Sequence, residues 1–224
     1  MPVGSYRFKS GVSAFFEMAT ADARAVLPDH LEPIEVTHQR SILSVTAFLF
    51  DDSVVGPYTE LMFSVIVPPM VAEWGQHAKA AFFPFLAATS SAEARRIKSE
   101  RFHFPYHPEN IDAQFIETKE KLRVRVFGGD EPIMDLSVTQ GEWETTTHLL
   151  QGFMMDGDQR LRTTLQISGE YTVHENERGE MKLFPHPMTA DHFLGEVSED
   201  RKSGGSGKSG ENGGRRISKK KQQA

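Results

Sequence analysis

Short runs of β-branched and aromatic residues, each bounded by turn-forming residues, most limit the folds open to this chain of 224 residues. Residues 41–50 and 58–67 are two such runs, and the turn-rich segment DDSVVGP joins them. Residues 111–117 and 122–127 alternate apolar and polar side chains, as the strands of a half-buried hairpin do. Many short strands separated by turns indicate an antiparallel sheet or barrel with helices at its edge.

Helix signals are fewer than strand signals. Thr20 precedes a predicted helix at 21–27, which Pro28 stops, and a capping box at Ser90 and Glu93 predicts a second helix that runs to about residue 98. A short third helix is expected at 189–194. Further strands are predicted at 131–139, 161–167, 170–175 and 181–184, and the dipeptide Asp156-Gly157 is a hairpin turn signal.

Several residue types and motifs are absent from the sequence, which limits the chemistry that the protein can perform. The chain has no cysteine, which excludes disulfides, a thiolate nucleophile, cysteine-ligated zinc and iron–sulfur clusters. It has no GxxxxGK[ST], GxGxxG or GxSxG motif, so nothing supports a phosphate-binding loop or a serine nucleophile elbow. No run approaches the roughly 18 apolar residues of a membrane helix, and no signal-peptide core is visible. We therefore expect a soluble cytoplasmic protein with no membrane partner and no cofactor.

Composition divides the chain into a domain at 1–196 and a tail at 197–224. The last 24 residues carry eight Lys or Arg and one Glu, a net charge of +7, so residues 1–200 carry −13 within a total of −6. Among these 24 residues Ile217 is the only aliphatic side chain larger than alanine, too little apolar surface to order the segment. We expect a disordered, flexible extension, with an acidic partner or the acidic domain itself as alternatives. Nucleic acid is disfavoured because no aromatic residue interleaves with the charges.

The densest group of chemically active side chains lies in the segment ERFHFPYHPE. His103 and His107 are four residues apart, but Pro105 between them prevents the helix that would put both on one face. As a metal pair their spacing is therefore weak, and a third ligand such as Glu60 would be needed. As acid–base groups the histidines are better candidates, because imidazole titrates near neutrality. The alternative is a loop whose aromatic residues plug the end of a barrel.

Glu60 lies at the start of an apolar strand, in the sequence GPYTEL. If its carboxylate pointed into a barrel, burial would raise its pKa and suit it to proton transfer. If it pointed outward, it would be an ordinary charge on an edge strand. The pattern alone leaves both open.

Six motifs follow one another along the chain, namely GSYRF, ARAVLPDHLEP, GPYTE, KLRV, YTVHE and LFPHPM. Taken in order, they resemble the acetoacetate decarboxylase family across residues 4–196. The resemblance implies an α+β fold, namely a cone-shaped, mainly antiparallel β-barrel with flanking helices and an interior cavity, in a protein that forms homo-oligomers.

The resemblance breaks at the catalytic lysine. Enzymes of that family form a Schiff base through a lysine that follows a proline, and an adjacent lysine lowers its pKa. Here Pro105 matches the proline, but Tyr106 and His107 stand at the two lysine positions, and neither can form an imine. Lys98 is the nearest lysine that could replace the nucleophile, and Lys79 is a weaker candidate.

Other pocket positions also differ. A family arginine falls at Gly11 and one of two pocket glutamates falls at Val45, whereas Glu60 and the supporting Glu100 match family glutamates. This pattern suggests either an enzyme that works without the lysine or a scaffold that has lost its active site.

Two functions therefore stand. The first is a small-molecule enzyme that acts on an oxo-acid or related carbonyl compound by lysine-independent acid–base chemistry, through enolisation, dehydration, cyclisation or decarboxylation. Glu60 would be the acid or base, Tyr106 the donor to an enolate oxygen and His107 the proton shuttle or carboxylate ligand. Glu100, His103 and Phe104 would contact the substrate. The second is a non-catalytic barrel that binds a hydrophobic ligand.

Overall fold

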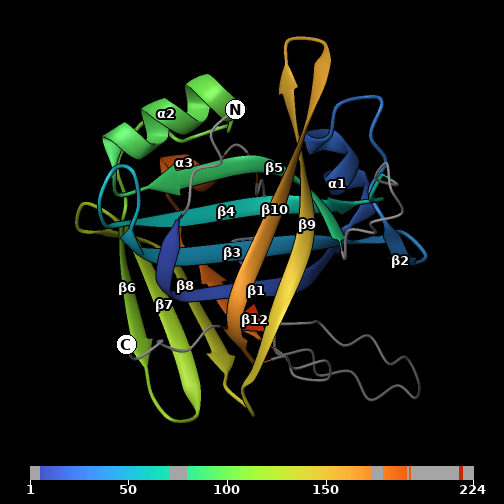
Figure 1. Cartoon of the computed structure of the whole chain (residues 1–224). Helices are drawn as coiled ribbons and strands as arrows, with labels where there is room; N and C mark the ends of the chain where they lie inside the picture. Colours follow the sequence, from blue (N-terminus) through green and yellow to red (C-terminus); the bar gives the residue numbers. More distant parts are fainter. Residues whose placement is uncertain (1–5, 71–79, 173–178, 191, 193–216, 219–224) are drawn as a thin grey trace.

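Two β-sheets make up most of the structure, a computed structural model that describes residues 6–70, 80–172, 179–190, 192 and 217–218. Three helices accompany them, and Figure 1 labels the elements. In chain order these are β1 (Arg7–Ala19), α1 (Thr20–Val26), β2 (Glu35–Thr37), β3 (Arg40–Asp52), β4 (Tyr58–Val67), β5 (Ala80–Thr89), α2 (Ala92–Phe102), β6 (Asp112–Glu117), β7 (Lys121–Gly128), β8 (Glu131–Thr139), β9 (Glu144–Asp156), β10 (Gln159–Tyr171), β11 (Glu180–Leu183), α3 (Pro187–Ala190) and β12 (Ile217–Ser218).

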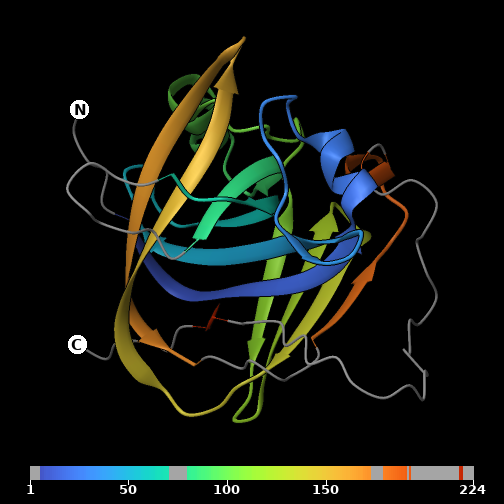
Figure 2. The ribbon, with the colours of Figure 1, turned by 90° about the vertical axis from the view of Figure 1, so that its right-hand side faces the viewer.

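The larger sheet has eight strands in the order β10-β9-β5-β4-β3-β1-β12, with β2 beside β3. Its described pairs are antiparallel, except that β9 joins β5 in parallel at Ala80–Phe82. The sheet curls strongly, so that β9 and β10 cross over the face formed by β3, β4 and β5 (Figures 1 and 2). The result is a half-barrel with a concave face. Its closure into a complete barrel stays a prediction, because no described pairing joins β12 to β10.

The smaller sheet has the order β11-β8-β7-β6 and runs across one end of the half-barrel. The helix α2 lies beyond the carboxyl end of β5, whereas α1 lies toward the opposite end of the same sheet (Figure 1). A core of buried apolar side chains joins the two sheets. Its largest fully buried members include Phe63 of β4, Ile133 of β8 and Phe153 of β9.

The strongest strand signals predicted the elements well. The strands at 58–67 and 131–139 begin and end as expected, and 161–167 and 170–175 belong to the single strand β10 as far as the structure describes them. The sequence analysis did not assign β1, β5 or β9. In β5, Pro84 sits inside the strand, and the register shifts beside it between Phe63 and Ser64 of β4. A proline at a bulge loses no ladder hydrogen bond, which is how β5 accommodates it.

The tail lies outside the described residues, apart from Ile217 and Ser218. These two pair with Ser13 and Val12 of β1, and thus extend the edge of the larger sheet. The expected disorder of the rest of 197–224 stays a prediction. Among the helices that the structure describes, none is long and apolar enough to cross a membrane.

Candidate active site

Glu60 points to the concave face of the curled sheet. Its cross-strand partner on β3 is Phe48, and directly paired residues of an antiparallel ladder share a face. Met62 and Ser64 follow Glu60 at the period of two that keeps side chains on one side of a strand, and both line a cavity on that face. The carboxylate is only 3% exposed. Of the two orientations that the sequence left open, the structure places Glu60 inward.

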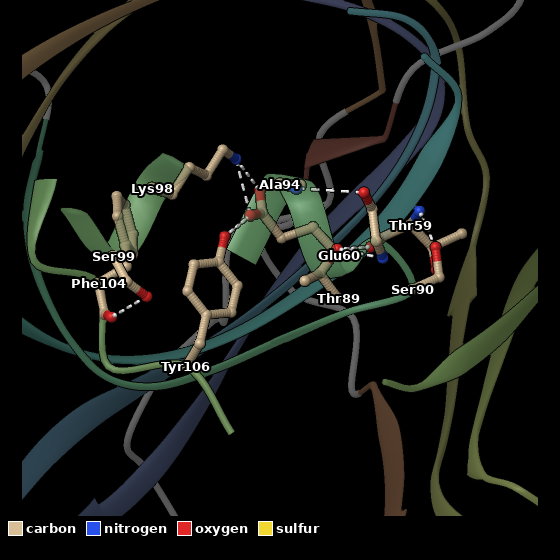
Figure 3. Close-up of polar contacts among 10 residues, drawn as sticks. Thr59, Glu60, Thr89, Ser90, Ala94, Lys98, Ser99, Phe104 and Tyr106 are labelled. Carbon is tan, nitrogen blue, oxygen red and sulfur yellow. Dashed lines mark hydrogen bonds and ion pairs between the residues drawn. The ribbon is translucent and has the colours of Figure 1, made fainter. Parts of the chain in front are cut away.

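Two donors converge on this carboxylate (Figure 3). The Lys98 ammonium lies 2.7 Å from Oε1 and 2.7 Å from Oε2, and the Tyr106 hydroxyl donates a hydrogen bond to Oε1. The lysine comes from α2, the glutamate from β4, and the tyrosine from the segment after α2. Three separate parts of the chain thus meet at one buried anion.

Helix α2 delivers Lys98. Ser91 caps the helix by accepting a hydrogen bond from the amide of Ala94, which satisfies one of the free amides of the first turn. Ser90, the residue that the sequence favoured as the cap, accepts from the amide of Thr59 instead. Ala94 is buried against Phe50 and Tyr58, so the helix lies on the aromatic end of β3 and β4.

Aromatic rings surround the lysine. Its Nζ lies 5.3 Å from the ring centroid of Tyr6, 5.4 Å from that of Phe50 and 5.3 Å from that of Tyr58. Ring faces attract a cation at such distances, and the attraction grows when water is excluded. Lys98 is 13% exposed. Three ring faces and a carboxylate therefore all stabilise the charged ammonium rather than a free amine.

Tyr106 reaches Glu60 because its segment pairs with the end of β5. His103 ends α2 in the left-handed conformation, with φ of 55°. The amide of Ala87 then donates to the carbonyl of Pro105 at 3.0 Å, and the amide of His107 donates to the carbonyl of Ala87 at 2.7 Å. Neighbouring residues of an extended segment point to opposite sides, so Tyr106 faces inward and His107 does not.

The phenols here are held protonated. Burial and the neighbouring Glu60 carboxylate together raise the pKa of Tyr106 far above its ordinary value, and they do the same for Tyr58. Tyr106 is therefore a hydrogen-bond donor and not a base. The Tyr58 hydroxyl is buried without a hydrogen-bond partner.

The hydrogen bonds that the Glu60 carboxylate already accepts leave few of its lone-pair sites free. An ionised carboxylate offers about four lone-pair sites. Lys98 uses one on each oxygen and Tyr106 a second on Oε1. The spare site is therefore on Oε2, which is the atom best able to accept a further proton.

His107 lies away from this group. Its ring faces that of His186 at 6.1 Å between centroids, and its Nε2 is buried without a partner. Burial lowers the pKa of His107, the nearby Glu109 opposes that shift, and His186 and Arg95 add to it. The structure thus does not bring His107 to Glu60 and Tyr106.

Of the other residues predicted for the site, Glu100 and His103 lie at the surface, and Phe104 lies at the cavity. Glu100 is an exposed partner of Arg96, and the His103 ring lies 3.8 Å from the Asp156 carboxylate at the surface. Phe104 does line the cavity, with its ring 6.0 Å from that of Tyr106. Among the described residues no three His, Asp or Glu side chains gather as a metal site would require.

The cavity has a volume of about 210 Å³ and lies on the concave face between β1, β3, β4, β5, β9 and β10. Phe48 and Phe104 belong to its lining. Phe48 pairs with Glu60 across the β3–β4 ladder, and the Phe104 ring lies beside that of Tyr106. Gly11 of β1 also lines it. A Cβ atom at Gly11 would come within 2.6 Å of the Phe48 ring, so the ring occupies the space that a larger side chain at position 11 would need.

Sequence reasoning found Glu60 and Tyr106 but did not place Lys98 or its aromatic neighbours in the site. Lys98 was named only as the nearest lysine, and the signal that could have placed it is the helix register, since Lys98 lies one turn after the buried Ala94. Tyr6 and Tyr58 belong to the motifs GSYRF and GPYTE, and Phe50 belongs to none, but nothing in those motifs indicates that the three rings meet around a lysine. Lys79 lies outside the described residues.

Comparison with solved structures addresses the fold. Acetoacetate decarboxylase from Legionella pneumophila subsp. pneumophila str. Philadelphia 1 superposes with a TM-score of 0.56 at 15% identity, over 97% of this chain and 84% of that one. A second acetoacetate decarboxylase structure gives 0.55 at 14% identity, over 97% and 86%. The fold is that of acetoacetate decarboxylase.

The structure of a biosynthetic enzyme is similar as well. The enduracididine biosynthesis enzyme MppR, complexed with the condensation product of pyruvate and imidazole 4-carboxaldehyde, gives a TM-score of 0.57 at 12% identity, over 97% of this chain and 86% of that one. No protein-family profile matches the chain, and no curated protein matches it in sequence. The acetoacetate decarboxylase fold is thus established by structure alone, and the chemistry must be argued from the residues.

Proposed function

We propose that the chain is a small-molecule enzyme that enolises a carbonyl compound by acid–base chemistry at Glu60, Lys98 and Tyr106. The observation that carries the proposal is the convergence of an ammonium and a phenol on one buried carboxylate beside a cavity. The scaffold supports it, because similar structures include acetoacetate decarboxylases and an enzyme complexed with pyruvate.

The proposed step is a proton transfer. Glu60 Oε2 takes a proton from the carbon next to the carbonyl and becomes a carboxylic acid. The electron pair of that C–H bond moves to form the C=C bond, and the carbonyl oxygen becomes an enolate. Lys98 and Tyr106 donate hydrogen bonds to that oxygen, which replaces their bonds to the Glu60 carboxylate as its charge disappears. Returning the proton completes an exchange, and dehydration, cyclisation or decarboxylation would each pass through a similar enolate.

The proposed chemistry needs no imine. Lys98 Nζ is bonded to both carboxylate oxygens and faces three rings, and each contact favours the ammonium over the amine that attacks a carbonyl. We therefore expect borohydride to trap no adduct with oxo-acids or ketones, as read by intact-protein mass spectrometry. A trapped adduct that maps to Lys98 would replace the acid–base mechanism with an imine mechanism.

Deuterium exchange tests the proposal directly. A panel of ketones and oxo-acids is incubated with the protein in D₂O, and loss of the proton signal next to the carbonyl is followed by NMR. We expect the wild type to accelerate exchange and Glu60→Gln to lose at least a hundredfold of that acceleration, as removal of a general base does. Glu93→Gln, the same change at an exposed carboxylate on α2, is the matched control. Exchange unaffected by Glu60→Gln would refute the proposal.

The non-catalytic barrel remains the second candidate, and the apolar lining of the cavity is the observation that favours it. Ligand binding without any exchange would support that reading.

A further inference from the structure

The lining and the volume of the cavity indicate a class of substrate, which the Glu60 group alone does not. We propose that the cavity binds the apolar tail of an uncharged ketone or aldehyde, of about eight carbons, rather than a small oxo-acid. The placement of the carbonyl head at Glu60 rests on the proposed function, whereas the placement of the tail rests on the cavity alone.

The lining is apolar almost throughout. Aromatic and aliphatic side chains form most of it, including Phe8, Phe15, Phe82, Phe104, Met154 and Leu165. Several of its polar side chains are already bonded within the protein. Ser13 pairs with Thr46, and the Gln151 amide bonds to both backbone polar groups of Met70. The hydroxyls of Thr163 and Tyr171 are exceptions, because they are buried without a hydrogen-bond partner. Elsewhere the wall favours contact with hydrocarbon and offers few hydrogen bonds to a polar ligand.

The charges argue against a carboxylate. The described lining of the cavity contains no Asp, Glu, Lys or Arg, and its imidazole, that of His148, lies against the Tyr171 ring at 4.9 Å between centroids. The Lys98 ammonium is already paired with Glu60 through both carboxylate oxygens. His107, the residue expected to bind a substrate carboxylate, faces His186 instead. An oxo-acid seated here would place its carboxylate beside Glu60 with no Lys or Arg of the described lining to pair with it, which weakens its binding relative to that of an uncharged ketone.

The volume sets the length of the tail. A protein cavity of 150 Å³ lined by Leu, Ile and Phe holds benzene, so by proportion about 210 Å³ holds roughly eight carbon atoms. Leu165 lines the cavity and is 44% exposed, so in the described part of the chain its side of β10 forms the opening. A ligand enters there and extends toward Phe48 and Phe104, next to the polar group.

A homologous series tests the tail site. Methyl ketones from 2-butanone to 2-dodecanone are titrated into the full chain by calorimetry. Burying one methylene strengthens binding about fourfold, so the Kd should fall by that factor per carbon and level off near 2-decanone. Nonanoate, which replaces the ketone by a carboxylate, should bind at least tenfold more weakly than 2-decanone.

A glycine in the cavity wall provides the variants. A Cβ atom at Gly152 would meet Met154, Thr163 and Leu165, all cavity residues, no closer than 3.7 Å, so Gly152→Ala fits and Gly152→Leu fills the space. We expect Gly152→Leu to move the plateau to ketones shorter by about three carbons and Gly152→Ala to move it by one. Thr164→Leu adds bulk to the exposed face of β10 and should leave the plateau unchanged. Circular dichroism confirms that each variant folds.

The outcomes separate cleanly. A Kd that does not depend on chain length, a plateau that Gly152→Leu and Gly152→Ala do not move, or a carboxylate that binds as tightly as the ketone would overturn the inference. A length-dependent Kd without proton exchange would support the tail site and refute the proposed function instead.

Discussion

The concave face of the larger sheet has two ends with opposite chemistry. At the α2 end a carboxylate, an ammonium and a phenol are buried together and bonded to one another. Toward β9 and β10 the same face is a cavity of hydrocarbon and aromatic rings without a formal charge from Asp, Glu, Lys or Arg in its described lining. The cavity residue Met62 lies only two positions after Glu60 on β4. One strand therefore supplies both a reactive group and a site for an apolar ligand, and the two ends should respond differently to substitution.

Removing one member of the buried ion pair should have the largest effect. Glu60→Gln leaves the Lys98 ammonium buried without a carboxylate, and we expect a loss of about 3–5 kcal/mol in the free energy of unfolding, measured by urea denaturation. The double variant Glu60→Gln/Lys98→Met removes both charges and should recover much of that loss. If the double variant were no more stable than the single variant, the two charges would not depend on each other.

Within the polar end, Tyr106 and Tyr58 should differ in how much stability the protein loses when the hydroxyl group is removed. Tyr106→Phe removes a hydrogen bond to a charged acceptor, so we expect a loss of about 1.5–3 kcal/mol in the free energy of unfolding. Tyr58→Phe removes a buried hydroxyl that has no partner and should be neutral or stabilising. Equal losses in the two variants, measured in the same denaturation experiment, would contradict the hydrogen-bond assignment.

Two glycines of the cavity lining should respond to substitution in opposite ways. Gly11→Ala would bring a methyl group within 2.6 Å of the Phe48 ring, and such overpacking costs about 1–3 kcal/mol. Gly152→Ala meets nothing closer than 3.7 Å and should be neutral, or stabilising by about 0.5 kcal/mol, because alanine restricts the unfolded chain. Thermal unfolding of both variants checks the pair. A stable Gly11→Ala would mean that Phe48 can leave its position without cost.

The smallest effect concerns His107, on the other side of the segment that carries Tyr106. Because its pKa in the folded protein lies below the ordinary value of 6.5, the unfolded chain binds the proton first as the pH falls. Stability from this group is therefore present above pH 6.5 and is lost below it. We expect His107→Gln to lose less stability than the wild type between pH 7.5 and pH 5.5. His38→Gln, an exposed histidine, should lose as much as the wild type.

The sequence predicted the β-rich fold from strands whose patterns were simple, such as the run at 58–67. It missed β5 because Pro84 interrupts the pattern, and it missed β1 because Gly11 and Ser13 dilute the apolar residues. In the site, Glu60 and Tyr106 were identified through motifs. The arrangement of Lys98 with three rings could not be, because it depends on how α2 lies across β3 and β4, and that packing is not local in the sequence.

The parallel pairing of β5 with β9 has a consequence for folding kinetics. Ala80 pairs with Leu150, and the intervening chain forms α2 and most of the smaller sheet. The entropy of closing so long a loop must be offset before this pairing contributes, whereas the β9–β10 hairpin is local and can form early. The hairpin should therefore dock late, as a unit, and the cavity should be complete only after that step. Ligand binding during refolding would then report the last event on the folding pathway and lag behind the appearance of β-structure.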